Sequence, residues 1–398
     1  MLVPRSRRRI FRTCNTKHLP CLDYQFEAAS SRSPDKMLSF HAVIVLCGLT
    51  LLSPYFASPV LSHTIKKRAV TPPTRSLEDV FTVKTHGDGD CTARLPELRT
   101  WLTESADLVA TALNAIDDYN TNLNVRKSMA TYLGTRYAAT GTGPQNQGQV
   151  NAVKTYLTRV LNFLNTGALG GGNSPAKLFC DSSWLHFQDP ATDWAYTPDS
   201  GYVKYDFDQD GQLEPATINE VPALASELTT ETQVDGTVIT RFPYWAPDIL
   251  EYVYEQDWGA SINHDYCSVL NEDGDLAHNA GTDTNTLPNT MLMCPVAFTR
   301  GSATLGSVAA VAGTTPLGTV QSRSLTLFHE LFHLTIGNKN TFDWCNSVAE
   351  CMGASASVAA EQTKARRSPE CFAYFALDMW YLRNRQISFA DGTAATPA

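Results

Sequence analysis

Apolar residues recur at steps of three and four residues in several parts of the chain, which predicts amphipathic helices. Such segments cover residues 98–116, 125–138, 147–165 and 324–337, and a further one starts at Ser368-Pro369-Glu370. Proline suits the first position of a helix, because the N–H that it lacks would have no partner inside the helix there. The predicted helices lie in the first and last thirds of the body.

The middle third has a different pattern. Short runs rich in β-branched and aromatic residues lie between Gly, Pro, Asn and Asp residues, which indicates strands joined by turns. These runs are residues 177–180, 184–187, 202–207, 236–242 and 291–298. Residues 246–257 are expected to form a helix. The sequence therefore predicts the α+β class, mainly helical with a small antiparallel sheet.

An apolar run follows Met37 and extends from Leu38 to Leu52. Its length is typical of a secretory signal and short for a membrane span, with a signal anchor as the alternative. A tribasic stretch that suits a processing protease ends at Arg68. We expect a basic extension over 1–36 (with Met37 as an alternative start), a signal peptide over 37–60, a short pro-segment over 61–68, one domain over 69–390 and a flexible tail over 391–398. The mature protein is then secreted and extracellular.

Charge and cysteine content limit the partners and the compartment. The chain has a formal net charge of −9, but its first 68 positions hold 11 of its 31 basic and only 3 of its 40 acidic residues, so the body is strongly acidic. An acidic body argues against binding to a phosphate backbone, and we expect no nucleic-acid partner. Seven of the ten cysteines lie in the body, and most cysteines pair in a secreted protein. Close spacing favours the pairs Cys267–Cys294 and Cys345–Cys351.

An HExxH motif spans His329 to His333. Residues four apart lie one turn apart on the same face of a helix, so the two imidazoles can bind one zinc ion. Glu330 lies about 100° further round the helix, where it can act on a water as a general base.

A catalytic zinc site needs a third protein ligand and an open position for water. Lys339 stands where the metzincin pattern requires a histidine, which excludes that pattern. Two downstream carboxylates are candidates. Asp343 follows shortly after Gly337, where the chain could turn back toward the metal, and Glu350 would suit a ligand on a second helix.

Three segments together resemble a known family. They are the motif helix, residues 340–343 (Asn-Thr-Phe-Asp), and the helix start Ser-Pro-Glu-Cys-Phe-Ala-Tyr-Phe-Ala. This combination resembles the aspzincins, the deuterolysin and peptidyl-lysine metalloendopeptidase group of secreted fungal peptidases. The resemblance implies a zincin-like fold that binds Zn²⁺ through His329, His333 and Asp343, with Glu330 as the general base.

The chain departs from the family motif Gly-Thr-x-Asp-x-x-Tyr-Gly in two places. Asn340 replaces the first Gly, and Asn346-Ser347 replaces Tyr-Gly. The family's Tyr helps to stabilise the oxyanion, so this role is open here. Tyr374, Tyr381 and Asn346 are the candidates that the sequence offers.

We therefore expect a monomeric secreted zinc endopeptidase that acts on protein or peptide substrates, without stable membrane association. In zincins an edge strand beside the motif helix pairs with an extended substrate, and Met291–Phe298 is the expected strand. The alternative is a secreted zinc-binding protein that scavenges the metal, or uses it for attachment, without turnover.

Overall fold

The computed structural model describes residues 69–136, 144–169, 175–199, 201–232, 238–308 and 311–397. The expected N-terminal extension, signal peptide and pro-segment lie outside the described residues. The described part mixes helices with small sheets, which confirms the α+β class. Within these ranges, no helix has both the length and the apolar character that a membrane span requires.

The helices and strands follow one another in a mixed order. The helices are α1 (Leu77–Val80), α2 (Leu95–Asp117), α3 (Leu123–Leu133), α4 (Pro144–Thr166), α5 (Pro222–Ala225), α6 (Ser324–Ile336), α7 (Val348–Ala356), α8 (Ala359–Ala365) and α9 (Pro369–Arg385). The strands are β1 (Phe81–Val83), β2 (Ala176–Phe179), β3 (His186–Phe187), β4 (Lys204–Tyr205), β5 (Glu214–Pro215), β6 (Thr230–Thr232), β7 (Val238–Ala246), β8 (Glu251–Gln256), β9 (Ala280–Asp283) and β10 (Thr290–Met293). Helices α2, α3, α4, α6 and α9 confirm the helices predicted from apolar spacing.

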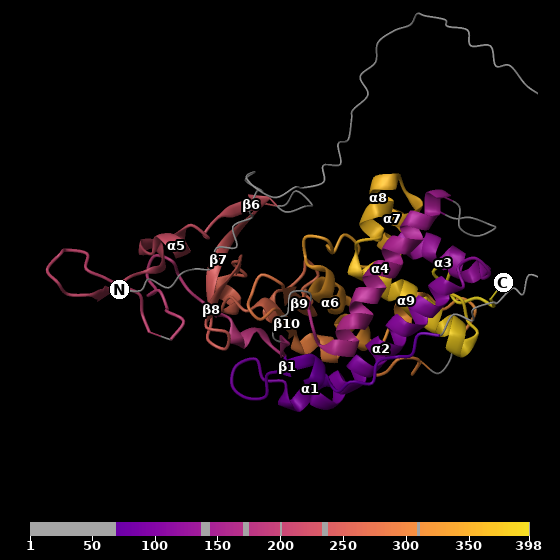
Figure 1. Cartoon of the computed structure of the whole chain (residues 1–398), viewed down its shortest axis with the longest axis horizontal. Coiled ribbons are helices and arrows are strands. Elements are labelled where there is room, and N and C mark those ends of the chain that lie inside the picture. Colours follow the sequence, from indigo (N-terminus) through magenta and orange to yellow (C-terminus); the bar gives the residue numbers. More distant parts are fainter. Residues whose placement is uncertain are drawn as a thin grey trace, which may run out of the picture. The chain divides into compact units, whose positions relative to one another are not determined.

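The motif helix α6 is packed between helices and a sheet. It contacts α2, α4 and α9 on one side and β9 and β10 on the other, as Figure 1 shows. Its apolar face buries Leu327, Phe328, Leu331 and Phe332 completely. Burial of each such side chain contributes about 1.5–3 kcal/mol. The helix that carries the HExxH motif is therefore held rigidly by the core.

The sheet beside α6 has the strand order β1-β2-β10-β9. Strands β1, β2 and β10 are parallel, and only β9, at the edge, runs antiparallel to its neighbour. The expectation of a small antiparallel sheet is wrong for this sheet, because α2, α3 and α4 provide the long crossover that parallel β1 and β2 require. It is correct for the second sheet, in which β7 pairs with β3, β6 and β8.

The expected substrate-pairing strand Met291–Phe298 is not an edge strand. Its first part belongs to β10, which lies between β2 and β9 and is buried along its whole length. The strand stops before Pro295, which has no N–H for a ladder and starts a short 3₁₀ helix. The edge next to α6 is β9.

The expectation of a helix over 246–257 is also wrong. A turn with Leu250 at φ 55° leads into β8, which pairs with β7. The segment Tyr252-Val253-Tyr254 consists of good strand formers, and pairing with β7 decides its conformation. Apolar spacing alone did not separate the two possibilities over so short a run.

Among the described residues, three disulfides are formed, Cys91–Cys180, Cys267–Cys294 and Cys351–Cys371. The second was expected. The expected pair Cys345–Cys351 is wrong, because α7 brings Cys351 to the first turn of α9, where the Cα atoms of Cys351 and Cys371 lie 5.5 Å apart. Cys345 is a buried free thiol.

Residues 391–397 do not form the expected flexible tail. Ala394 is buried, and its N–H bonds the Thr315 carbonyl at 2.8 Å. The preceding turn is held by α9, where the fully buried carboxyl of Asp378 accepts the Phe389 N–H at 2.6 Å. Burial raises the pKa of Asp378 to about 7, although the bond from Phe389 acts in the opposite direction.

The raised pKa of Asp378 predicts a pH-dependent stability. A carboxyl whose pKa is higher in the folded than in the unfolded protein stabilises the fold below its unfolded pKa of about 4, and this contribution is lost as the pH rises through about 7. Asp378→Asn keeps an acceptor for the Phe389 N–H and removes the titration. We expect the loss of unfolding free energy between about pH 5 and pH 8 to be roughly 2–3 kcal/mol smaller in this variant than in the wild type.

Urea unfolding at the two pH values measures this difference. Asp118→Asn makes the same chemical change at an exposed position and should leave the pH dependence as it is. An identical pH dependence in wild type and Asp378→Asn would show that the buried carboxyl does not titrate in this range.

Candidate metal centre

The two motif histidines and the candidate third ligand converge on one point. The Nε2 atoms of His329 and His333 lie 3.1 and 3.0 Å from Oδ1 of Asp343. All three donor atoms lie within 4.8 Å of one another. The structure thus brings together the three residues that the sequence predicts.

A short turn after α6 carries Asp343 back to the histidines. Gly337 ends the helix at φ 89°, a conformation that favours glycine, and its carbonyl accepts the N–H groups of Asn340 and Thr341. From the start of α9, the Arg367 guanidinium donates to the carbonyls of Lys339 and Asn340, both at 2.8 Å. The part of the loop that precedes Asp343 is therefore held both by its own turn and by Arg367.

The other nitrogen of each imidazole is held by a hydrogen-bond acceptor. Nδ1 of His329 lies 2.9 Å from the Glu370 carboxylate, and Nδ1 of His333 lies 3.1 Å from the Thr341 hydroxyl oxygen. The Thr341 hydroxyl donates to the Gly337 carbonyl, so toward His333 its oxygen accepts. Both Nδ1 atoms can therefore donate, and both Nε2 atoms face Asp343, where they become available as ligand atoms once a metal displaces their protons.

The geometry of the donors fits a zinc ion. In a tetrahedral site with bonds of about 2.0–2.2 Å, neighbouring ligand atoms lie roughly 3.3–3.5 Å apart. The contacts of 3.0 and 3.1 Å between the imidazoles and Asp343 are close to this spacing. Two imidazole nitrogens and one carboxylate oxygen are also a donor set that zinc prefers.

The electrostatics of the three groups are coupled. Burial alone would lower the pKa of His329, but the facing carboxylates of Asp343, Glu370 and Glu330 raise it well above its ordinary value. Burial would raise the pKa of Asp343, yet the two imidazoles hold it well below its ordinary value. A metal cation would take the place of this positive charge and release protons on binding.

Glu330 lies beside the three donors without joining them. Its Oε1 is 4.0 Å from Nε2 of His329, and the Thr282 hydroxyl on β9 donates to its Oε2 at 2.6 Å. The residue is only 5% exposed. This arrangement leaves Oε1 directed toward the metal ligands and able to accept a proton.

The other sequence candidates lie elsewhere. Glu350 accepts the Asn346 N–H and sits in the first turn of α7, away from the histidines. The Tyr374 hydroxyl is bonded by Gln321, and the Tyr381 hydroxyl donates to the Val320 carbonyl. None of the three oxyanion candidates, Asn346, Tyr374 and Tyr381, lines the cavity beside Glu330.

A cavity of about 260 Å³ adjoins Glu330, His333 and Asp343. Its wall includes Glu255 and Asp283. Burial, followed by the charge of Asp283, raises the pKa of Glu255 to about 7, with the Arg241 guanidinium acting in the opposite direction and Glu231 adding to the rise. Burial also raises the pKa of Asp283, against the opposing effects of Asn285, Arg241 and Thr286. The cavity is thus suited to a positively charged group.

The remaining walls of this cavity are largely apolar or uncharged. They consist of Trp184, Leu185, Val253, Trp258, Tyr266, Ala280, Gly281, Thr282, Thr290, Leu292 and Asn338. Sequence reasoning missed this cavity, because its residues come from strands and loops that are distant in sequence. It also missed the roles of Glu370, Thr341 and Thr282, although Glu370 and Thr341 lie in segments that carry the family resemblance.

The chain was compared with models of known protein families, with curated proteins and with solved structures, and no match was found. The resemblance to the aspzincins therefore rests on the motif residues alone.

Removal of Asp343 tests the ligand set. Asp343→Ala leaves two imidazoles, and we expect its zinc affinity to fall by more than about 100-fold, since removing even a supporting hydrogen bond of a ligand costs about 10–100-fold. Metal analysis after dialysis, with a competition titration, measures the change. Glu350→Ala is the matched control and should keep about one zinc per chain. Loss of zinc from Glu350→Ala and not from Asp343→Ala would show that Glu350, not Asp343, is the third ligand.

Proposed function

We propose that this protein is a secreted zinc-dependent endopeptidase with a zincin-like fold. The observation that carries the proposal is the convergence of His329, His333 and Asp343, with the carboxylate of Glu330 directly beside them. Two imidazoles and one carboxylate leave the open coordination position that a catalytic zinc needs. The three disulfides also suit an oxidising, extracellular compartment.

His329, His333 and Asp343 would hold the zinc, which supplies positive charge that acidifies a water and polarises the scissile carbonyl. Glu330 accepts the proton of the attacking water at Oε1 and delivers it to the nitrogen of the leaving amine. The Thr282 hydroxyl keeps Glu330 in position throughout by its bond to Oε2. Each of these steps uses groups that already lie together.

Strand β9 supports the same proposal. It is the edge of its sheet, it contacts α6, and its Thr282 binds the proposed general base. An extended peptide can add to such an edge as a further strand, and main-chain hydrogen bonds then fix the position of the scissile bond. The edge role that was expected for Met291–Phe298 thus belongs to β9 in this proposal.

The alternative is a zinc-binding protein without turnover. Such a protein would need the three ligands but not Glu330, a carboxylate that is buried, held by Thr282 and open to the cavity. Burial of a carboxylate costs free energy, and a zinc-binding protein without turnover has no use for this carboxylate. The presence of Glu330 beside the three donors therefore favours an enzyme.

Glu330→Gln tests the enzymatic proposal. The glutamine can still accept the Thr282 hydroxyl, but it cannot take a proton from water. We expect kcat on a casein or peptide substrate to fall by about 10²–10⁴-fold, with zinc content unchanged. Glu361→Gln makes the same change at a half-exposed position on α8, where the carboxylate pairs with Lys364, and should keep full activity. Undiminished proteolysis by zinc-loaded Glu330→Gln would remove the mechanism.

The acidic cavity predicts a preference for substrates with a basic side chain near the scissile bond. The carboxyl of Glu255 gains its charge as the pH rises through about 7. The ratio of kcat/KM for a lysine peptide to that for its norleucine analogue should therefore rise between about pH 6 and pH 8. Glu255→Gln should lower this ratio by about 10-fold and flatten its pH dependence, on the scale of one charge-assisted contact.

Glu272→Gln is the matched control, because Glu272 is exposed and does not line the cavity. Equal ratios in wild type and Glu255→Gln at both pH values would show that the cavity does not select a cation.

A further inference from the structure

We propose that the hydroxyl of Tyr266 donates a hydrogen bond to the carbonyl oxygen of the scissile peptide, and that it becomes available when substrate replaces it at the Ala280 carbonyl. The inference rests on the proposed endopeptidase function. It assigns the oxyanion role that the departure at Asn346-Ser347 leaves open. No motif marks Tyr266 in the sequence.

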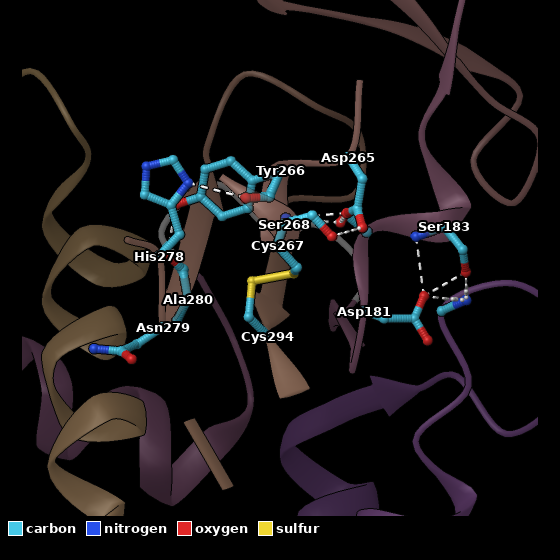
Figure 2. Close-up of a disulfide and its surroundings, with 12 residues drawn as sticks. Asp181, Ser183, Asp265, Tyr266, Cys267, Ser268, His278, Asn279, Ala280 and Cys294 are labelled. Atoms are coloured by element: carbon cyan, nitrogen blue, oxygen red, sulfur yellow. Dashed lines mark hydrogen bonds between the residues drawn. A yellow bond between two sulfur atoms is a disulfide. The ribbon is translucent and has the colours of Figure 1, made fainter. Parts of the chain in front are cut away.

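The backbone around Tyr266 is held in place. The residue starts a 3₁₀ turn, Tyr266–Ser268, in which the Asp265 carboxylate accepts the N–H of Cys267 and the hydroxyl of Ser268. The next residue forms the disulfide Cys267–Cys294, which ties the turn to the end of β10. Figure 2 shows this disulfide with Tyr266 and Ala280 beside it.

The ring of Tyr266 is held as firmly as its backbone. It stacks on the His278 ring at a centroid distance of 4.1 Å and meets the Trp258 ring edge to face at 5.1 Å. Nδ1 of His278 also contacts the Tyr266 carbonyl at 3.1 Å, as Figure 2 shows. The hydroxyl donates to the Ala280 carbonyl at 2.6 Å. The position of the phenolic oxygen is therefore fixed, and only its proton can turn.

The Ala280 carbonyl faces the side of β9 that a substrate would use. The Asn279 carbonyl accepts the Cys294 N–H from the β10 side. Backbone groups alternate along a strand, so those of Ala280 and Thr282 point outward from the sheet. Side chains donate hydrogen bonds to both of these carbonyls. The Tyr266 hydroxyl donates to the Ala280 carbonyl, and the Asn338 amide donates to the Thr282 carbonyl at 2.8 Å.

Substrate pairing with β9 therefore requires an exchange of hydrogen bonds. A peptide N–H that bonds the Ala280 carbonyl takes the place of the Tyr266 hydroxyl, and the phenolic O–H can then turn toward the peptide carbonyl. The number of hydrogen bonds is conserved, so the exchange costs little. The donor is released only when a peptide lies on β9.

Two further observations support this role. Tyr266 lines the cavity together with Glu330 and Asp343. Burial, together with the negative charges of Glu330, Glu255 and Asp343, raises its pKa well above the ordinary value, so the hydroxyl keeps its proton at neutral pH. A Cβ on Gly281 would lie 3.1 Å from the hydroxyl oxygen, so the glycine leaves room for it.

Tyr266→Phe removes the hydroxyl and keeps the ring. We expect kcat to fall by about 100-fold, as for loss of one oxyanion donor, with KM unchanged or lower because the Ala280 carbonyl becomes free. The affinity of the zinc-loaded protein for a phosphinic peptide, which mimics the tetrahedral state, should fall by about 10-fold or more in calorimetry. Tyr244→Phe is the matched control, since its hydroxyl also bonds a backbone carbonyl but does not line the cavity.

Gly281→Ala gives an independent test of the same contact. It should lower kcat in the wild-type background, where the new methyl group lies 3.1 Å from the hydroxyl oxygen, and lower it less in Tyr266→Phe, where only the contacts of 3.3 and 3.4 Å with ring carbons remain. Unchanged kcat and unchanged phosphinic-peptide affinity in Tyr266→Phe, or a raised KM alone, would overturn the inference. Absence of peptidase activity in the wild-type protein would instead overturn the proposed function.

Discussion

The arrangement of the site depends on the orientation of two imidazole rings. Glu370 and Thr341 each accept an Nδ1–H, so both Nε2 atoms face Asp343. Without these acceptors the rings could take the other tautomer or turn away, and the three donors would no longer share one point. A hydroxyl and a carboxylate outside the HExxH motif therefore decide whether the motif can bind a metal.

The rest of the fold holds these groups in position relative to one another. The core holds α6 through its leucine and phenylalanine face, and Arg367 holds the loop of Asp343 from the start of α9. On the opposite side, β9 brings Thr282 to Glu330. Helix, loop and edge strand thus each supply one part of the proposed chemistry, and the acidic cavity with Tyr266 extends the site along β9.

The sequence predicted those parts that depend on local spacing. Apolar periodicity identified α6 and the long helices, and the HExxH motif gave His329 and His333 as candidate ligands. Spacing left Asp343 and Glu350 both open as the third, and the resemblance to the aspzincins implied Asp343. The parts that depend on long-range pairing were missed. The sequence predicts a helix where β8 pairs with β7, and an edge strand where β10 lies inside its sheet. It also favours Cys345 as the partner of Cys351, whereas the packing of α7 against α9 pairs Cys351 with Cys371. Glu370 was noted only as part of a helix start and Tyr266 carries no local signal, since only the folded chain brings them to the site.

Zinc-edge anomalous diffraction from crystals of the mature protein grown with zinc tests the central claim most directly. The account predicts one strong anomalous peak that is bonded to Nε2 of both motif histidines and to a carboxylate oxygen of Asp343, with Glu330 outside the bonding distance of about 2.0–2.2 Å. A peak bonded elsewhere, or no peak between the two imidazoles at saturating zinc, would contradict it.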